Sequence, residues 1–241
     1  MSSGIDLSIV VPAYSEERTI EEALCKLHNE MSKTGLTFEI ILVVDGRVDK
    51  TAEIAVSLNM TSLKIISYEQ NQGKGYALRT GTAETSGLVT AFFDGDLDID
   101  ASCLFGLYRR LHESGADVVV GSKVHPDSVV SYPLFRRFQS RVMRLLVRTL
   151  FSLDIGDTQT GIKVFRTSRL QEAINEVQTT GFSFDVDLLV RMHDQGCNIV
   201  EGPIVLAYQF ASTTSLKSSL VVLSDLLSLK MKRIKRQGRQ R

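Results

Sequence analysis

Short apolar segments alternate with longer segments of helical spacing along most of this 241-residue chain. The apolar segments are rich in Val, Ile and Phe, and several of them stop at a proline, an aspartate or a glycine. Strands that alternate with helices of ten or more residues build βαβ units, whose sheets are mostly parallel. The expected strands are residues 7–11, 38–44, 63–67, 88–93, 117–121, 161–166 and 199–207. The sequence therefore predicts an α/β fold with a mostly parallel central sheet flanked by helices.

Between the strands, apolar residues recur at the three- and four-residue spacing of helices that cover a sheet. The expected helices are residues 16–33, 49–58, 73–85, 101–114, 167–177 and 184–194. The chain contains no internal repeat and no low-complexity linker. We expect one compact domain over residues 1–215, followed by a C-terminal extension over residues 216–241.

The distribution of cysteine and charge limits the classes of function. The three cysteines lie far apart with no CxxC pair, which is typical of reduced thiols in a cytosolic protein. We expect no signal peptide and no membrane-spanning segment, because no uncharged apolar run reaches roughly 18 residues. Residues 230–241 carry seven cations and no acid, although the formal net charge is zero. This asymmetry favours a local anionic partner, and we expect no nucleic acid because no aromatic residue interleaves the cations.

Three carboxylates, Asp94, Asp96 and Asp98, follow the apolar strand 88–93 at two-residue spacing. This spacing puts alternate side chains on the same side of an extended backbone, so the three can point at one spot. Gly95 lets the backbone come close to a ligand there. Clustered carboxylates repel each other unless a cation joins them, and oxygen ligands suit Mg²⁺, Mn²⁺ or Ca²⁺. The alternative interpretation is a solvated acidic turn after a strand.

Four sequence features are expected at one edge of the predicted sheet. Pro12, Asp45 and Asp94 each end an expected strand, and the loop before Gly73 precedes a helix. In open parallel sheets, ligands bind beyond the C-terminal ends of the strands. Lys74 opens the helix, where free amides and the helix dipole attract phosphate. This convergence favours a ligand site over an acidic turn.

Six motifs, taken together, resemble the family 2 glycosyltransferases, which have a nucleotide-sugar-binding, Rossmann-like (GT-A) fold. The later motifs resemble most the polyprenyl-phosphate sugar synthases, namely the dolichyl-phosphate mannose and glucose synthases. The motifs are Val11-Pro12-Ala13-Tyr14-Ser15-Glu16, Val44-Asp45-Gly46, Asn71 to Arg79, Asp94-Gly95-Asp96, Asp157 to Phe165, and Phe184 to Leu189. Each motif is weak alone, but six in order are specific.

The resemblance implies a role for each matching residue. A nucleotide sugar, GDP-mannose or UDP-glucose, would be the donor, and Mg²⁺ or Mn²⁺ would be the cofactor. The metal would be held by Asp94, Asp96 and Asp98, although many relatives have glutamine at the last position. Asp96, Lys123 and Asp185 are the expected catalytic residues. The residues expected around the donor are Pro12, Tyr14, Glu16, Val43, Asp45, Lys74, Asp94 and Gly95.

Two departures from the family pattern concern phosphate and donor binding. Val44 stands where relatives commonly have the first of two adjacent aspartates. Lys123 stands where they usually have arginine, which keeps the charge but loses the bidentate grip on phosphate. Acceptor or diphosphate binding could therefore differ in this chain.

A basic stripe lies between the expected strands at 117–121 and 161–166. Arg137, Arg141, Arg144 and Arg148 recur at helical spacing among apolar residues. A basic amphipathic helix of this kind suits a membrane surface with anionic headgroups. Arg137 and Arg141, with Lys123, are candidates to hold an acceptor phosphate. The alternative is a helix that packs on the sheet and exposes its arginines to water.

The leading hypothesis is metal-dependent, inverting transfer of mannose or glucose to a polyprenyl or dolichyl phosphate. The enzyme would be peripheral, on the cytoplasmic face of a membrane, with a small membrane partner subunit as a further candidate partner. A phosphate acceptor is already largely ionised at neutral pH and needs little help from a base. Two alternatives stay open. One is transfer to a sugar hydroxyl with Asp185 or Asp187 as base, and the other is a non-catalytic, membrane-associated binding subunit.

Overall fold

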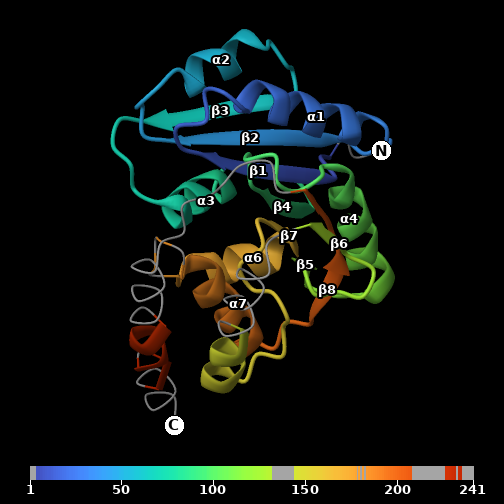
Figure 1. The fold of residues 1–241 in the computed structure, drawn as a ribbon, viewed down its shortest axis with the longest axis vertical. Coiled ribbons are helices and arrows are strands. Elements are labelled where there is room, and N and C mark those ends of the chain that lie inside the picture. The colour runs from blue at the N-terminus through green and yellow to red at the C-terminus, as the bar shows by residue number, and fades with distance from the viewer. Residues whose placement is uncertain are drawn as a thin grey trace.

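The computed structural model describes residues 4–131, 144–177, 179, 181, 183–207, 226–231 and 233–234 (Figure 1). Its central sheet has seven strands. These are β1 (Leu7–Ala13), β2 (Phe38–Asp45), β3 (Leu63–Tyr68), β4 (Val89–Phe93), β5 (Val118–Ser122), β7 (Ile162–Arg166) and β8 (Ile199–Pro203). The strand order is β3-β2-β1-β4-β7-β5-β8. Two short strands, β6 (Val129–Ser131) and β9 (Val205–Ala207), form a separate parallel pair.

The expectation of a mostly parallel α/β sheet is confirmed. The strands β3, β2, β1 and β4 pair in parallel, and so do β5 and β8. Strand β7 alone is antiparallel to its neighbours, β4 and β5. Because β7 runs the opposite way, its N-terminal end meets the C-terminal end of β4 at one edge of the sheet. This reversal brings the segment before β7 next to the acidic motif that follows β4.

Six named helices cover the two faces of the sheet. They are α1 (Ile20–Ser32), α2 (Thr51–Ser57), α3 (Lys74–Thr82), α4 (Ser102–Ser114), α6 (Thr167–Ile174) and α7 (Phe184–Asp194). One core cluster joins α1, α2 and α4 to one face, and a second joins α3, α6 and α7 to the other. Figure 1 shows α1 and α2 on one side of β1–β3, with α3 on the opposite side.

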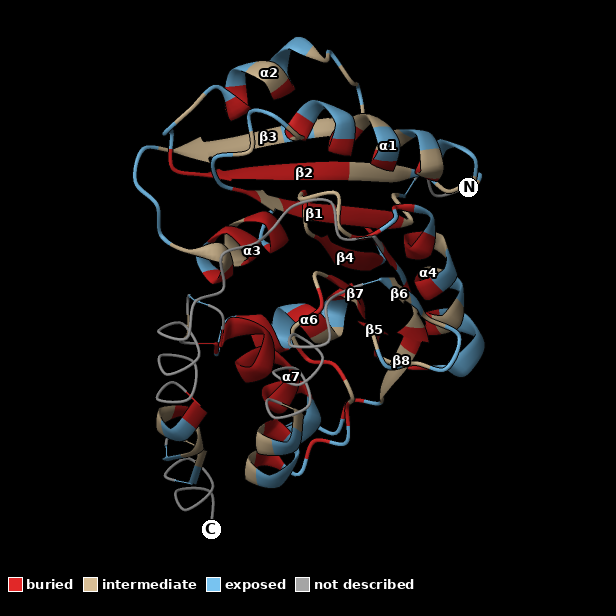
Figure 2. Cartoon of the chain, viewed as in Figure 1, coloured by how far each residue is buried: buried red, intermediate tan, exposed pale blue. Residues whose placement is uncertain are grey.

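The apolar pattern of each segment explains its place. In α1, Ile20, Leu24, Leu27 and Met31 form one stripe at helical spacing, and all four are buried. Strand β1 is buried along nearly its whole length because helices cover both faces of the sheet (Figure 2). Burial of these side chains contributes the main stabilisation of the fold, at about 25 cal/mol per Å² of apolar surface.

The single strand expected over residues 199–207 is wrong. The chain pairs with β5 as far as Pro203, and then β9 pairs with β6 in the second sheet. Proline lacks an N–H group for a strand ladder, which makes residue 203 a suitable point for the chain to leave the central sheet. An apolar run without alternation does not reveal such a break.

The described part of the basic stripe is helical over residues 144–151 and packs against the body through Val147 and Phe151. The side chain of Arg148 is exposed and lies 3.4 Å from Asp154. Arg137 and Arg141 fall outside the described residues. The segment that the structure describes therefore has one packed face and one solvated face.

Part of the predicted C-terminal extension also packs against the body. Leu226 and Leu229 are buried in the second core cluster. Arg233 donates hydrogen bonds to Asp194 at 2.6 and 3.1 Å and to the Phe151 carbonyl at 2.8 Å. Lys230 donates to the Leu150 carbonyl. These two cations are therefore engaged within the chain.

No helix in the described ranges is long and apolar enough to cross a bilayer.

Candidate active site

The C-terminal edge of the parallel strands collects the polar residues that the sequence analysis singles out. Asp45 is the last residue of β2, Asp94 follows β4, and Lys123 follows β5. The main-chain N–H of Asp94 donates a 2.9 Å hydrogen bond to the Gly161 carbonyl, just before β7. The prediction of a polar convergence at this edge therefore agrees with the strand order.

Asp45 fixes the loop that leads into α3. Its two carboxylate oxygens accept hydrogen bonds from the backbone N–H groups of Gln72 and Gly73, at 2.7 and 2.9 Å. Gly73 has a φ of +92°, a conformation that residues with a side chain rarely adopt. Asp45 is only 3% exposed. In this conformation Asp45 positions the start of α3, and contact with a nucleotide base stays a prediction.

Lys74, the first residue of α3, forms an ion pair across the site with Asp94. Its Nζ lies 2.7 Å from Oδ1 and 2.8 Å from Oδ2 of the carboxylate. The two side chains are 29% and 25% exposed, so water reaches the pair. The lysine that the sequence places at a helix start for phosphate binding therefore neutralises a predicted metal ligand.

Asp96 lies in the same acidic environment and is partly buried. Burial and then the Asp94 carboxylate raise the pKa of Asp96 from 3.8 to about 7. Burial also raises the pKa of Glu16, with smaller contributions from the charges of Asp49 and Asp94. The charge of Asp94 thus acts on both Asp96 and Glu16.

The three carboxylates of the expected metal site are not gathered into one cluster in the described residues, and their role as ligands stays a prediction. The described residues contain no group of three or more His, Cys, Asp or Glu side chains that could hold a metal ion. The backbone N–H of Asp98 donates to Oδ1 of Asp96 at 3.1 Å, which is a turn contact. Leu97 has a φ of +63°, so the backbone leaves the extended conformation on which the two-residue spacing depends.

Asp94 and Asp96 still fit a divalent cation as a two-carboxylate site. Their oxygens are the hard donors that Mg²⁺ and Mn²⁺ prefer, and the pKa of Asp96 is raised first by burial and then by the neighbouring charge of Asp94. Magnesium commonly uses one or two protein carboxylates and takes its other ligands from phosphate and water.

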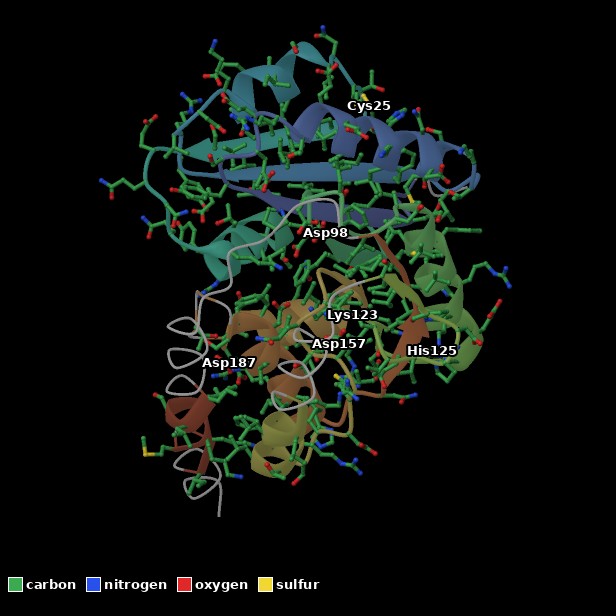
Figure 3. The ribbon with its side chains drawn as sticks, in the orientation of Figure 1. Cys25, Asp98, Lys123, His125, Asp157 and Asp187 are labelled. Carbon is green, nitrogen blue, oxygen red and sulfur yellow. The ribbon has the colours of Figure 1, made fainter. Side chains whose placement is uncertain are left out.

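Lys123 forms an ion pair with Asp157 on the segment that leads to β7. The Nζ and Oδ2 atoms are 2.9 Å apart, and the Lys123 N–H also donates to Oδ2 at 3.1 Å. Figure 3 shows the two labelled residues side by side near the middle of the molecule. The Asp157 side chain is 9% exposed, and the pKa of Asp157 is lowered because Lys123 and hydrogen bonds outweigh its burial. Lys123 thus anchors the 157–161 segment, and contact with an acceptor phosphate stays a prediction.

Asp185 and Asp187, at the start of α7, are both buried and both paired. Asp185 lies 2.8 Å from Nζ of Lys163, and Asp187 lies 2.6 Å from Nε of Arg191. Lys163 also donates to the Thr160 carbonyl at 2.5 Å. Both carboxylates are therefore engaged by cations of the chain.

Three of the residues expected around the donor lie close to β1. Tyr14 is 48% exposed beyond the end of β1, and Pro12 is the half-buried residue before that end. Gly95 is buried beside Val11. Val43 differs, because it is 0% exposed and lies against α3, where a Cβ on Gly81 would meet its Cγ2 at 3.1 Å. The structure places Val43 in the core and not at the surface of the site.

Two residues beside the predicted site residues, Lys163 and Gly161, are not predicted from the sequence. Lys163 is a lysine inside an apolar strand, and this pattern signals a buried charge that needs a carboxylate partner. Gly161 carries its signal only in three dimensions: a Cβ there would lie 2.2 Å from Oδ2 of Asp94. The absence of a side chain at residue 161 makes room for the Asp94 carboxylate.

Comparison with known proteins identifies the family. The family model described as "Glycosyl transferase family 2" matches residues 8–173, which include all of β1 except Leu7 and the whole of β2 to β7. The chain belongs to glycosyl transferase family 2. The resemblance drawn from the six motifs is thereby confirmed at the level of the family.

The similar family 2 proteins include the branch that the motifs resemble. Glycosyltransferase AglD of Haloferax volcanii is 32% identical over 208 residues, which cover 84% of this chain and 33% of that protein. The dolichyl-phosphate beta-glucosyltransferase of Drosophila melanogaster is 28% identical over 204 residues, covering 78% and 63%. That of Saccharomyces cerevisiae is 28% identical over 252 residues, covering 94% and 75%. The chain thus spans one third to three quarters of these relatives.

Solved structures support the same fold. A glucosyl-3-phosphoglycerate synthase of Mycobacterium tuberculosis, in complex with Mn²⁺, UDP and phosphoglyceric acid, superposes with a TM-score of 0.72. The two chains are 22% identical, and the match covers 95% of this chain and 79% of the other. The similarity confirms the expected GT-A fold.

Proposed function

We propose that this family 2 chain transfers glucose from UDP-glucose to a polyprenyl phosphate with inversion at the anomeric carbon. The relatives named dolichyl-phosphate beta-glucosyltransferase favour glucose over mannose and a lipid phosphate as acceptor. The donor would lie at the C-terminal sheet edge, between α3 and the turn that carries Asp94 and Asp96.

One observation carries the choice of acceptor: both candidate bases on α7 are engaged. Asp185 is paired with Lys163, and Asp187 with Arg191, and the four side chains are less than 10% exposed. A sugar hydroxyl would need a carboxylate free to take its proton. A phosphate monoester, with a second pKa of about 6, arrives with its attacking oxygen already ionised. The arrangement therefore favours a phosphate acceptor.

The residues of the chain act by position and charge. Asp94 and Asp96 would hold a Mg²⁺ or Mn²⁺ ion, which neutralises the departing diphosphate when bound. Lys74 stands at the same place and presents a second positive charge to the diphosphate oxygens. Lys123, held between Asp157 and Thr160, presents a positive charge from the end of β5 toward the acceptor side.

An activity screen with the purified full chain tests this function. Vesicles containing a short polyprenyl phosphate are mixed with labelled UDP-glucose or GDP-mannose and with Mg²⁺ or Mn²⁺. We expect labelled lipid from UDP-glucose, none with EDTA, and none with the unphosphorylated polyprenol. Turnover onto free sugars or 3-phosphoglycerate, without any onto polyprenyl phosphate, would contradict the proposal.

Two variants separate catalysis from folding in this screen. Asp96→Asn keeps the shape of the side chain and should reduce transfer by at least about 100-fold, since it removes half of the expected metal site. Asp127→Asn removes a carboxylate that is 80% exposed and should leave the rate within about twofold. Circular dichroism of both proteins shows whether they are folded.

A further inference from the structure

The Lys74–Asp94 ion pair occupies the atoms that a metal ion would use. The ammonium group lies within 2.8 Å of both carboxylate oxygens, so it covers the front of the carboxylate. The ammonium takes up part of the accepting capacity of both oxygens and repels a second cation, so it competes with a divalent ion for Asp94. The ion pair and a metal ion at the predicted site therefore oppose each other electrostatically.

Three carboxylates act on the ammonium group of Lys74. Burial acts to lower the pKa of Lys74, but the carboxylates of Asp94, then Asp185, and also Asp96 outweigh it and raise this pKa. Lys74 therefore stays charged across the physiological pH range. The Asp185 carboxylate, which pairs with Lys163, also contributes to this raised pKa of Lys74.

The Lys74–Asp94 pair is exposed enough to water for Lys74 to leave Asp94. The Lys74 and Asp94 side chains are 29% and 25% exposed, and partly hydrated ion pairs contribute little stability because water competes for both charges. Lys74 has four rotatable side-chain bonds and sits at the first turn of α3, so its ammonium can move without any change in the helix.

We propose that Lys74 is the resident counter-ion of the metal site, displaced from Asp94 when the cation enters together with a nucleoside diphosphate. The diphosphate offers Lys74 new anionic oxygens, whereas a free metal ion offers it none. The site would therefore bind free metal weakly and the metal–nucleotide complex strongly. This inference rests on the proposed use of a nucleotide sugar and adds the order in which its components bind.

Replacement of Lys74 by methionine should change the two affinities in opposite directions. Without nucleotide, Mn²⁺ binds Lys74→Met about five- to tenfold more tightly than the wild-type chain, because no ammonium competes for Asp94. With saturating Mn²⁺, UDP binds the variant about tenfold more weakly, because one cation that contacts the diphosphate is gone. Electron paramagnetic resonance of Mn²⁺ and titration calorimetry with UDP measure the two affinities.

Control variants separate this inference from the proposed function. Lys64→Met removes a lysine that is 49% exposed and pairs with Glu84, and it should leave the Mn²⁺ affinity within about twofold. Asp94→Asn should lose Mn²⁺ binding with and without UDP. If Asp94→Asn binds Mn²⁺ like the wild type, the metal site of the proposed function is wrong.

A different result would contradict the proposed role of Lys74 as counter-ion. If Asp94→Asn loses Mn²⁺ but Lys74→Met binds free Mn²⁺ with unchanged or lower affinity, Lys74 does not compete for the carboxylate. Absence of measurable Mn²⁺ binding to folded Lys74→Met also contradicts the proposal, because this variant is expected to be the tightest binder of the free ion. The thermal unfolding of each variant is measured alongside.

Discussion

Two lysine–aspartate pairs of nearly equal length meet at the site but differ in burial. Lys74 and Asp94 are 2.7 Å apart with about a quarter of each side chain exposed. Lys163 and Asp185 are 2.8 Å apart with 2% and 7% exposed. Lys163 has a further acceptor in the Thr160 carbonyl, at 2.5 Å. Distance alone does not separate these pairs, whereas access to water does.

The difference in burial separates a fixed contact from an exchangeable one. Breaking a buried pair leaves a charge without solvent, while breaking a hydrated pair returns both charges to water. Lys163 and Asp185 thus hold the 157–161 segment and α7 together, and Gly161 on that segment holds the backbone of Asp94. The Lys163–Asp185 pair therefore keeps the backbone around Asp94 in place while the Lys74–Asp94 pair can dissociate.

The largest effect should come from breaking the fixed pair. Lys163→Met leaves Asp185 buried without its counter-ion and should lower the free energy of unfolding by about 3–5 kcal/mol. The loss is measured by urea denaturation. The double variant Lys163→Met/Asp185→Leu should recover most of it, because no charge then remains buried. A single-variant loss below about 1 kcal/mol would show that Asp185 finds water or another partner.

Another buried pair on the same helix provides the control. Asp187 points away from Asp185, because two residues turn a helix by about 200°. Arg191→Met breaks the Asp187–Arg191 pair and should also cost several kcal/mol, because the two side chains are 1% and 9% exposed. Of the two variants, if both remain folded, only Lys163→Met should also weaken Mn²⁺ binding with UDP present.

A smaller loss of stability is expected from a substitution at Gly161, which lies against the Asp94 carboxylate. Gly161→Ala places a Cβ at 2.2 Å from Oδ2 of Asp94, a distance at which the carboxylate must move. Overpacking of this kind should cost about 1–3 kcal/mol of stability. It should also weaken Mn²⁺ binding in the presence of UDP, measured by calorimetry.

Gly106 provides the matched control for Gly161. It lies in α4, and a Cβ there meets no atom within 4 Å. Gly106→Ala should therefore stabilise the helix by up to about 1 kcal/mol and leave Mn²⁺ binding unchanged. Equal effects of the two substitutions would mean that the space beside Asp94 is not what residue 161 provides.

The sequence predicts the location of the exposed Lys74–Asp94 pair better than that of the buried Lys163–Asp185 pair. Strands that end at Asp45 and Asp94 place both carboxylates at one edge, because parallel strands share the direction of their C-terminal ends. The helix start at Lys74 follows from the glycine before it. These predictions need only local patterns and one rule of topology.

The buried Lys163–Asp185 pair depends on contacts between distant segments, which no local sequence pattern predicts. Lys163 meets Asp185 because β7 is antiparallel in the middle of the sheet, and neither residue reveals the direction of that strand. The same reversal brings Gly161 to Asp94. Asp98 departs from the extended spacing for a local reason, since Leu97 has a positive φ, and its role as a ligand stays a prediction. The core location of Val43 follows from the helix that covers it.

The smallest change in stability from a substitution within the site should come from removing the charge of Asp96. Burial and Asp94 raise the pKa of Asp96 to about 7, so the folded chain holds a proton there more tightly than the unfolded chain. The stability that this proton provides is lost as pH rises from about 4 to about 7. Above pH 7 the charged Asp96 destabilises the metal-free fold, and an uncharged asparagine does not.

Asp96→Asn should therefore make the metal-free protein more stable at pH 8, even as transfer is lost. At 1.36 kcal/mol per unit the shift sets an upper bound of about 4 kcal/mol, and partial hydration should reduce the gain to about 1–2 kcal/mol. Urea denaturation in EDTA at pH 5 and pH 8 measures it: the advantage of the variant should be larger at pH 8. Mn²⁺ with UDP should stabilise the wild-type chain at pH 8 and leave the variant unchanged. If the advantage is the same at both pH values, Asp96 titrates normally, and the excess negative charge beside Asp94 is already neutralised by Lys74.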